Sequence, residues 1–358
     1  MRSPVFCTLF DSNYLDKGLV MNESLESVCE NFVLYILAMD ERCFEVLTRL
    51  KNKHIIPISL TEFNRIEELE DIYKERPRVE FLWTCSSHLI DYILVYRNEQ
   101  WCTYIDADLL FYSDPTVLLD EMGDKTVQII EHRFTNSYDD RKLLEHSGRF
   151  CVEFNTFCKE EQSLKLLSWW KQKCRESCSS VASEKVFGDQ KYLVGWEKYE
   201  YVSIVKNLGG GLAPWNIGQY RLKNQDPFEL EEKKSGRVFR PVFYHFHNIA
   251  YHSAKEIDIN VFKRYWHPDK HLIMLLYEPY LKALDEKKDY LRDVYNFYPL
   301  ITIHPAFVQA RSATQSQKNT FIKKIAKLLH KETYIKKCFE ALKAIRRKIN
   351  SKADFIRL

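Results

Sequence analysis

The sequence lacks long apolar runs, paired cysteines and a large net charge. No stretch approaches the ~18–20 apolar residues that cross a bilayer, and residues 1–9 carry one Arg and no apolar region of signal-peptide length. The 10 Cys form no CxxC pair, which argues against a zinc site and fits free thiols in a reducing compartment. The net charge of +3 gives no global field for nucleic acids, which are not expected as partners. These absences favour a cytoplasmic protein.

Apolar and aromatic residues are abundant in the 358-residue chain. The hydrophobic share is 45%, which is ample for the core of one large domain or two smaller ones. Aromatic residues reach 14%, and they suit clefts that stack flat ligands or sugar faces as well as they suit core packing.

The first half of the sequence alternates short apolar runs with amphipathic or charged runs. Strands are predicted over residues 4–10, 32–38, 54–60 and 101–105, and helices over residues 22–31, 41–51, 61–76 and 86–97. This alternation predicts an α/β fold with a mostly parallel central sheet flanked by helices. Ligands bind at the carboxyl ends of strands in such sheets. Asp11, Asp40 and Asp106 lie just after predicted strands and are therefore candidates for chemistry.

The second half is less regular. Strands are predicted over residues 150–157 and 240–246, a helix over 160–178, and an exposed charged segment over 224–237. The Gly-rich segment 207–216 is either a loop that closes over a ligand, with Trp215 on a sugar, or a structural turn. We expect a catalytic domain over residues 1–250, a helical extension packed on it over 251–308, and a polar linker and basic helix over 309–358.

The C-terminal segment is strongly basic. Residues 323–348 carry ten Lys or Arg and two Glu, with apolar residues at helical spacing between them. This pattern is typical of an amphipathic helix on an anionic membrane, which would place the protein at the inner face of the cell membrane. The alternatives are a helix whose apolar face packs on the core or on a second subunit, and a nucleic-acid-binding helix, which the lack of interleaved aromatics disfavours.

The strongest local signal is a pair of carboxylates at the end of the strand predicted over 101–105. Asp106 and Asp108 stand at positions i and i+2, and apolar residues follow them. Hard divalent cations bind carboxylate oxygens together with phosphates and act as Lewis acids. The alternative is that these acids cap a helix or a turn.

With these aspartates in place, the sequence resembles GT-A fold glycosyltransferases, in particular the family that contains glycogenin and the bacterial lipopolysaccharide galactosyl- and glucosyltransferases. The resemblance covers roughly residues 4–250 and rests on segments in the family's order. They are CTLFDSNY (7–14) with Gly18-Leu19 and Ser24-Leu25, YIDAD (104–108), FNT (154–156), GDQ (188–190) and YHFH (244–247).

The resemblance implies a role for each matching residue. The residues expected to contact the nucleotide are Thr8, Asp11 and Tyr14, together with Asp106 and Asp108 through the metal. The expected metal ligands are Asp106, Asp108 and His245, and an imidazole ligand favours Mn²⁺ over Mg²⁺. The residues expected to line the donor-sugar pocket are Asn155, Asp189 and Gln190. Family members retain the anomeric configuration.

Several family features are missing from this sequence. Residues 83–88 (WTCSSH) include no Lys or Arg in the helix before the two aspartates, residues 154–157 (FNTF) lack the family's glycine, and the HxxGxxKPW ending is absent. His247 lies on the same face of the predicted strand as His245, so either histidine is a candidate for the third ligand.

The function predicted from these residues is metal-dependent transfer of a sugar from a nucleoside-diphosphate sugar, UDP-linked, to a glycan or lipid-linked glycan of a bacterial surface polysaccharide. One alternative is a non-catalytic scaffold that binds glycans or the membrane surface with a decayed site. Another is a sugar nucleotidyltransferase. That enzyme needs a Gly-rich basic loop after the first strand, and residues 10–18 offer only Lys17 and Gly18.

Overall fold

The computed structural model describes residues 3–135, 137–253, 256–259, 261, 269–298 and 355–357. The chain divides into two units, the first made of Met1–His247 and Pro268–Pro299 and the second of Asn248–His267 and Leu300–Leu358. The first unit contains the central sheet and every predicted site residue. The second contains an antiparallel sheet of β13 (Ala250–Ser253), β14 (Glu256–Asp258) and β15 (Phe355–Arg357). The domain limits at residues 250 and 308 stay predictions.

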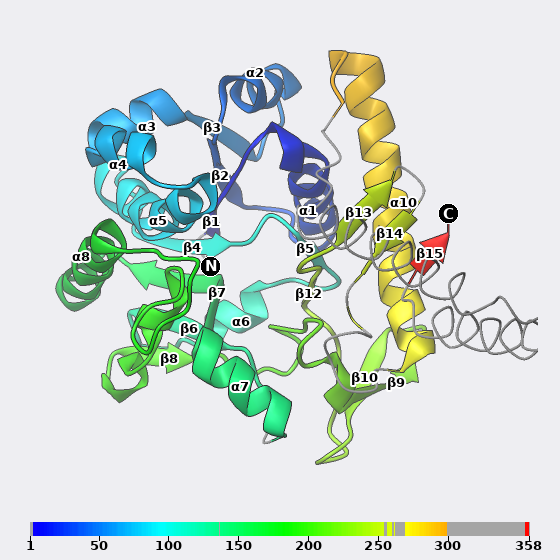
Figure 1. Cartoon of the computed structure of the whole chain (residues 1–358). Coiled ribbons are helices and arrows are strands. Elements are labelled where there is room, and N and C mark those ends of the chain that lie inside the picture. Colours follow the sequence, from blue (N-terminus) through cyan, green and yellow to red (C-terminus); the bar gives the residue numbers. More distant parts are fainter. Residues whose placement is uncertain are drawn as a thin grey trace, which may run out of the picture. The chain divides into compact units, whose positions relative to one another are not determined.

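The first unit is built on a seven-stranded sheet (Figure 1). In spatial order its strands are β3 (Ile55–Ser59), β2 (Val33–Ala38), β1 (Val5–Phe10), β4 (Trp101–Ile105), β7 (Phe150–Cys158), β6 (Val127–Glu131) and β8 (Val202–Ile204). β7 runs antiparallel to both of its neighbours, and the other pairings are parallel. The predicted fold class, a mostly parallel sheet flanked by helices, is confirmed.

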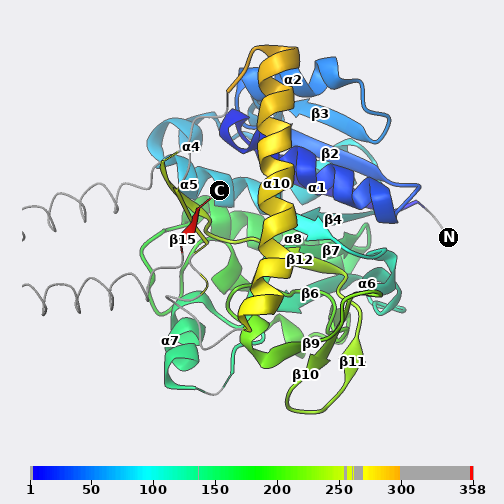
Figure 2. The same cartoon turned by 90° about the vertical axis from the view of Figure 1, so that its right-hand side faces the viewer.

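Helices cover both faces of this sheet. α5 (Arg78–Asp91) and α8 (Glu161–Glu176) pack together on one side, and α1 (Leu15–Val28) and α10 (Lys270–Tyr295) lie against each other on the other side (Figures 1 and 2). α10 is the C-terminal helix of the predicted fold class, but the start of the extension predicted over 251–308 contains the strands β13 and β14 rather than helix. The remaining described α-helices are α2 (Glu41–Leu50), α3 (Leu60–Glu67), α4 (Glu70–Glu75), α6 (Thr116–Asp120) and α7 (Tyr138–Ser147). Among the described helices, none is long and apolar enough to cross a membrane.

The packing explains why β1 reads as an unbroken apolar run. All six of its residues are buried, because side chains that alternate along a strand meet a helical layer on each face. Cys7 belongs to the core formed with α5 and α8. Phe10 faces α1 so closely that a Cβ on Gly18 would lie 2.4 Å from its ring. The glycine therefore permits α1 to approach the strand that carries Asp11.

The structure corrects several predicted elements. The first helix starts at Leu15 rather than residue 22, and the helix expected at residue 86 starts at Arg78. The run 61–76 is two helices, separated where Glu68 adopts a positive φ of 55°. The segment 224–237 is mostly exposed, as predicted, but it also contributes to a small sheet of β9 (Tyr220–Asn224), β10 (Glu229–Glu232) and β11 (Val238–Phe239).

The predicted basic helix falls almost entirely outside the described residues. Near the end of the range 309–358, Phe355–Arg357 form strand β15 and not a helix. The rest of the 309–358 prediction is not described by the structure.

Candidate metal and donor site

The candidate site lies at the edge of the sheet where β1 and β4 end. Asp11 follows β1 and Asp106 follows β4. The two strands are parallel neighbours, with Cys7 opposite Tyr104. Because parallel strands end at the same edge, both predicted acids reach that edge.

Two short strands bring a distant histidine to the same place. β5 (Leu109–Phe111) begins directly after Asp108 and pairs antiparallel with β12 (Phe243–His245), where His245 lies opposite Leu109. The amide of Phe246 donates a hydrogen bond to the Asp108 carbonyl at 2.9 Å. The backbone register therefore fixes His245 beside the second aspartate.

The three predicted metal ligands converge. His245 Nε2 lies 3.1 Å from an Asp108 carboxylate oxygen and 3.7 Å from an Asp106 carboxylate oxygen. One potential ligand atom from each residue lies within 4.8 Å of the others. Asp108 and His245 are buried and Asp106 is half-buried. Whether these residues hold a metal stays a prediction.

The charges at this cluster are unevenly compensated. Burial and the neighbouring carboxylates of Asp108 and Glu153 raise the pKa of Asp106 to about 7, although His245 acts in the opposite direction. Burial alone would raise the pKa of Asp108, but the charge of His245 and its hydrogen bond lower it well below the usual range. The same partnership raises the pKa of His245 well above normal despite its burial. The charged form of Asp106 is therefore the one that this cluster disfavours, and positive charge placed beside it would lower its pKa.

Glu153 is a site residue that the sequence reading missed. It lies on β7, it is completely buried, and its Oε2 contacts His245 Nδ1 as hydrogen-bond acceptor. Its backbone carbonyl accepts a hydrogen bond from the Asp106 amide at 3.2 Å. The available signal was an acid inside an apolar strand, two positions before Asn155 and thus on the same face.

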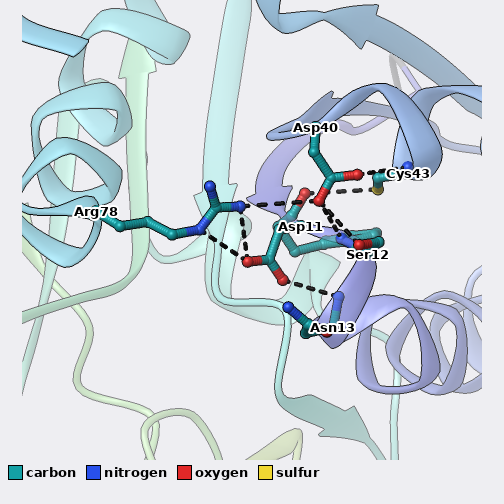
Figure 3. A network of polar contacts seen from close by, with 7 residues as sticks. Asp11, Ser12, Asn13, Asp40, Cys43 and Arg78 are labelled. Atoms are coloured by element: carbon teal, nitrogen blue, oxygen red, sulfur yellow. Dashed lines mark hydrogen bonds and ion pairs between the residues drawn. The ribbon is translucent and has the colours of Figure 1, made fainter. Parts of the chain in front are cut away.

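A charged network surrounds the end of β1 (Figure 3). Arg78 donates to the Asp11 carboxylate through Nε at 3.0 Å and Nη2 at 2.7 Å. Asp40 accepts from the backbone amide and the hydroxyl of Ser12, each at 2.9 Å, and from the Cys43 amide at 2.8 Å. Arg78 was missed because its helix was predicted to start later. The network orders the loop that carries the predicted nucleotide contacts.

The other predicted nucleotide contacts lie on β1 and in the turn after it. Thr8 is buried, and its hydroxyl has no hydrogen-bond partner among the residues that the structure describes. Tyr14 is 38% exposed, and the amine of the buried Lys17 lies 3.4 Å from the centroid of its ring. A flat, partly open ring beside a cation is suited to an anionic ligand with an aromatic base.

The predicted sugar-pocket residues have different environments. Asn155 is buried opposite Tyr104, and its side-chain amide meets no partner in the described part of the chain. Asp189 is buried and accepts a hydrogen bond from the Ser86 hydroxyl. Burial, opposed by the Ser86 hydrogen bond, raises the pKa of Asp189 to about 6. The Gln190 amide donates to the Ser147 carbonyl at 2.9 Å, so it is already engaged at the end of α7.

The Gly-rich segment 207–216 is held in place as a structural loop. Arg133 donates to the carbonyls of Asn207 and Leu208 at 2.8 and 3.2 Å and also to that of Gly210. Trp215 is buried and packs edge-on against His245, with ring centroids 5.3 Å apart. These contacts favour the turn alternative, with Trp215 packed on the candidate metal ligand.

Comparison with known sequences connects this chain to proteins without an assigned activity. No protein-family model matches the sequence. The chain is 30% identical over 263 residues to the uncharacterized protein YfnF of Bacillus subtilis (strain 168), covering 70% of this chain and 84% of that protein. It is 26% identical over 302 residues to the uncharacterized protein YfnD of the same strain, covering 82% of this chain and 92% of YfnD.

Similar solved structures include several glycosyltransferases. The galactosyltransferase LgtC, solved with donor and acceptor sugar analogs, is 16% identical with a TM-score of 0.49, covering 79% of this chain and 95% of LgtC. GlyE of Streptococcus pneumoniae TIGR4 is 12% identical with a TM-score of 0.47, covering 85% of this chain and 66% of GlyE. Likenesses of this degree do not transfer an activity, which has to follow from the site itself.

Proposed function

The chain belongs to the same family as YfnF, and we propose that it is a metal-dependent glycosyltransferase. It transfers a sugar from a nucleoside-diphosphate sugar, UDP-linked, to a glycan or lipid-linked glycan, with retention of the anomeric configuration. The observation that carries this proposal is the meeting of Asp106, Asp108 and His245 at the edge where Asp11 also lies. One edge of the sheet thus carries the candidate metal ligands together with the polar turn that follows β1.

The donor set suits a divalent cation. Two carboxylates and an imidazole fit Mn²⁺ better than Mg²⁺, which prefers oxygen ligands alone. The raised pKa of Asp106 supports this fit, because the charged form of this carboxyl is disfavoured in the cluster and a bound cation would stabilise it. When bound, the metal supplies Lewis-acid stabilisation of charge on the leaving diphosphate.

The chain's own residues supply the remaining recognition. Thr8, Asp11 and Tyr14 bind the nucleoside, and the Lys17 amine beside Tyr14 adds positive charge for the diphosphate. Buried polar groups without a protein partner are costly unless a ligand satisfies them. The Asn155 amide is such a group and is therefore assigned to a donor-sugar hydroxyl. Asp189 and Gln190 complete this pocket in the proposal, although the Gln190 amide must leave Ser147 to do so.

The acceptor and the location are further parts of the proposal. A basic C-terminal segment, residues 323–348, supports residence at the inner face of the cell membrane. An enzyme held there would meet a growing surface polysaccharide or its lipid-linked precursor. We therefore assign the reaction to bacterial surface polysaccharide synthesis.

Thermal unfolding with UDP and Mn²⁺ tests the donor assignment. Ligands that bind only the folded state at 100 times their Kd add about 2.7 kcal/mol to the free energy of unfolding. UDP and Mn²⁺ together should raise the melting temperature more than either alone. No shift with any nucleoside diphosphate and metal would reject the donor site and favour the scaffold alternative.

A nucleotide-sugar hydrolysis screen tests the metal ligands. Asp108→Asn should lower the rate about 100-fold or more, because even outer-shell changes at metal sites cost 10–100-fold. The matched control is Asp124→Asn, an equal change at a carboxylate that is 92% exposed. Equal hydrolysis by Asp108→Asn and the control would remove the metal-site assignment.

A further inference from the structure

Glu153 is a charged side chain in the interior of an apolar strand. β7 is buried from Phe150 to Phe157, and Glu153 is 0% exposed. Burial of a carboxylate is expensive unless partners stabilise it. Its presence there therefore requires a compensating contact, and among the described residues the Glu153 carboxylate is hydrogen-bonded to His245 alone.

This contact gives the two nitrogens of the His245 imidazole different partners. Nδ1 faces the Glu153 carboxylate, while Nε2 lies 3.1 Å from Asp108 and 3.7 Å from Asp106. An imidazole that donates its Nδ1 proton to a carboxylate presents the Nε2 lone pair to a metal. The carboxylate also makes the imidazole a more basic ligand.

Backbone and neighbouring contacts make the arrangement rigid. The Glu153 carbonyl accepts a hydrogen bond from the Asp106 amide at 3.2 Å. Glu153 is thus hydrogen-bonded to two of the candidate ligands, Asp106 and His245. Trp215 stands perpendicular to the His245 ring at 5.3 Å and restricts its rotation. A Cβ on Gly211 would lie 3.3 Å from Glu153 Oε1, so the loop also closes on the free side of the carboxylate.

We propose that Glu153 is the positioning residue of the metal centre, which holds His245 with Nε2 toward Asp106 and Asp108. This inference rests on the proposed function, because it requires that these three residues bind the cation. Glu153 itself is not a ligand of that cation. The Cys151 thiol also lies within 4.8 Å of ligand atoms of Glu153 and His245, but a thiol is a weak acceptor and does not replace the carboxylate.

The test is Mn²⁺ affinity of the full-length protein, measured by the electron paramagnetic resonance signal of free Mn²⁺. Glu153→Gln keeps the shape but removes the charge, and we expect it to weaken Mn²⁺ binding 10–100-fold. Glu153→Leu removes the acceptor and should weaken binding further. Glu153→Asp keeps the charge and should recover part of the loss seen in Glu153→Leu.

The control separates positioning from a general effect on folding. Thr156 is buried on the same strand and bonds to Thr103 at 2.9 Å, away from His245. Thr156→Val should lower the melting temperature and leave Mn²⁺ affinity unchanged. Should Glu153→Leu fail to fold, Glu153→Gln still decides the question.

The outcomes distinguish the two proposals. If the wild-type protein binds no Mn²⁺, both the metal-dependent function and the role of Glu153 fail. If the wild type binds Mn²⁺ and Glu153→Gln binds it equally well, only the role of Glu153 fails. Weaker binding by Glu153→Gln with unchanged binding by Thr156→Val supports the inference.

Discussion

Asp189 is a buried carboxyl with an unusual titration. Burial raises its pKa to about 6, although the Ser86 hydroxyl bonds to it. Its side of the pocket is also fixed by the Trp170 indole, which donates to the Asp189 carbonyl at 3.0 Å. The folded chain therefore holds this proton to a higher pH than an unfolded chain does, and stability falls as the pH rises from about 4 to 6.

Asp189→Asn should remove that pH dependence. A difference of about 2 pKa units corresponds to about 3 kcal/mol. The free energy of unfolding of the variant should therefore exceed that of the wild type by about 3 kcal/mol at pH 7.5 and by about 1 kcal/mol at pH 4.5. Urea unfolding at both pH values measures this. Asp124→Asn, at an exposed site, should differ from the wild type by less than about 0.5 kcal/mol at either pH. A constant difference for Asp189→Asn would contradict the assigned titration.

Individual site residues were predictable where the sequence directly around them indicates their position. Asp11 and Asp106 follow apolar strands, and strand ends are visible in the sequence. Glu153 and Arg78 were not predicted, because their roles depend on partners 92 and 67 positions away. Local periodicity shows where a strand ends, but it does not show which side chain will lie opposite.

At the scale of elements, the positions of the strands in the sequence were predicted better than their directions in the sheet. The strand 101–105 has the predicted bounds, because its apolar residues stop at Asp106. The sequence does not indicate that β7 is antiparallel to its neighbours, because a buried strand has the same apolar pattern in a parallel and in an antiparallel sheet. β5 has three residues, too few for a periodic signal, yet its pairing with β12 delivers His245. Pro77 lies directly before α5, and a proline at this place is typical of the start of a helix. The spacing of apolar residues alone did not indicate this earlier start.

The Gly-rich loop gives a test at this scale. A Cβ on Gly209 would lie 2.2 Å from the Arg240 carbonyl oxygen, a backbone atom that cannot turn away. Gly209→Ala should therefore cost about 3 kcal/mol in the free energy of unfolding, the upper end for overpacking.

The control for this variant is another glycine with free space around it. Gly123 has a φ of +57°, and none of the described atoms lies within 4 Å of a Cβ built there. Gly123→Ala should cost only the ~1 kcal/mol of the left-handed backbone. If chemical denaturation gives equal losses for both variants, the loop is not packed as the structure has it.

Charge is unevenly distributed over the whole molecule. Residues 323–348 carry ten basic and two acidic side chains, and the remaining residues carry 43 basic and 48 acidic ones. The near-neutral total of +3 thus hides a segment of +8 and a remainder of −5. Such segregation suits a protein whose body is repelled by an anionic surface while its end is attracted to it.

The proposed attachment to the membrane through this segment makes a quantitative prediction. Each Lys or Arg near an anionic surface contributes about 1 kcal/mol, so replacing four of them by Gln should weaken binding to anionic vesicles about a thousandfold. The four are Lys336, Lys337, Arg346 and Arg347. The control changes net charge equally at four exposed lysines of the sheet-containing unit, namely Lys51, Lys53, Lys206 and Lys234. Vesicle flotation of the full-length proteins should show loss only in the first variant, and only with anionic lipid at low salt. An equal loss of flotation in both variants would mean that overall charge, and not this segment, governs attachment.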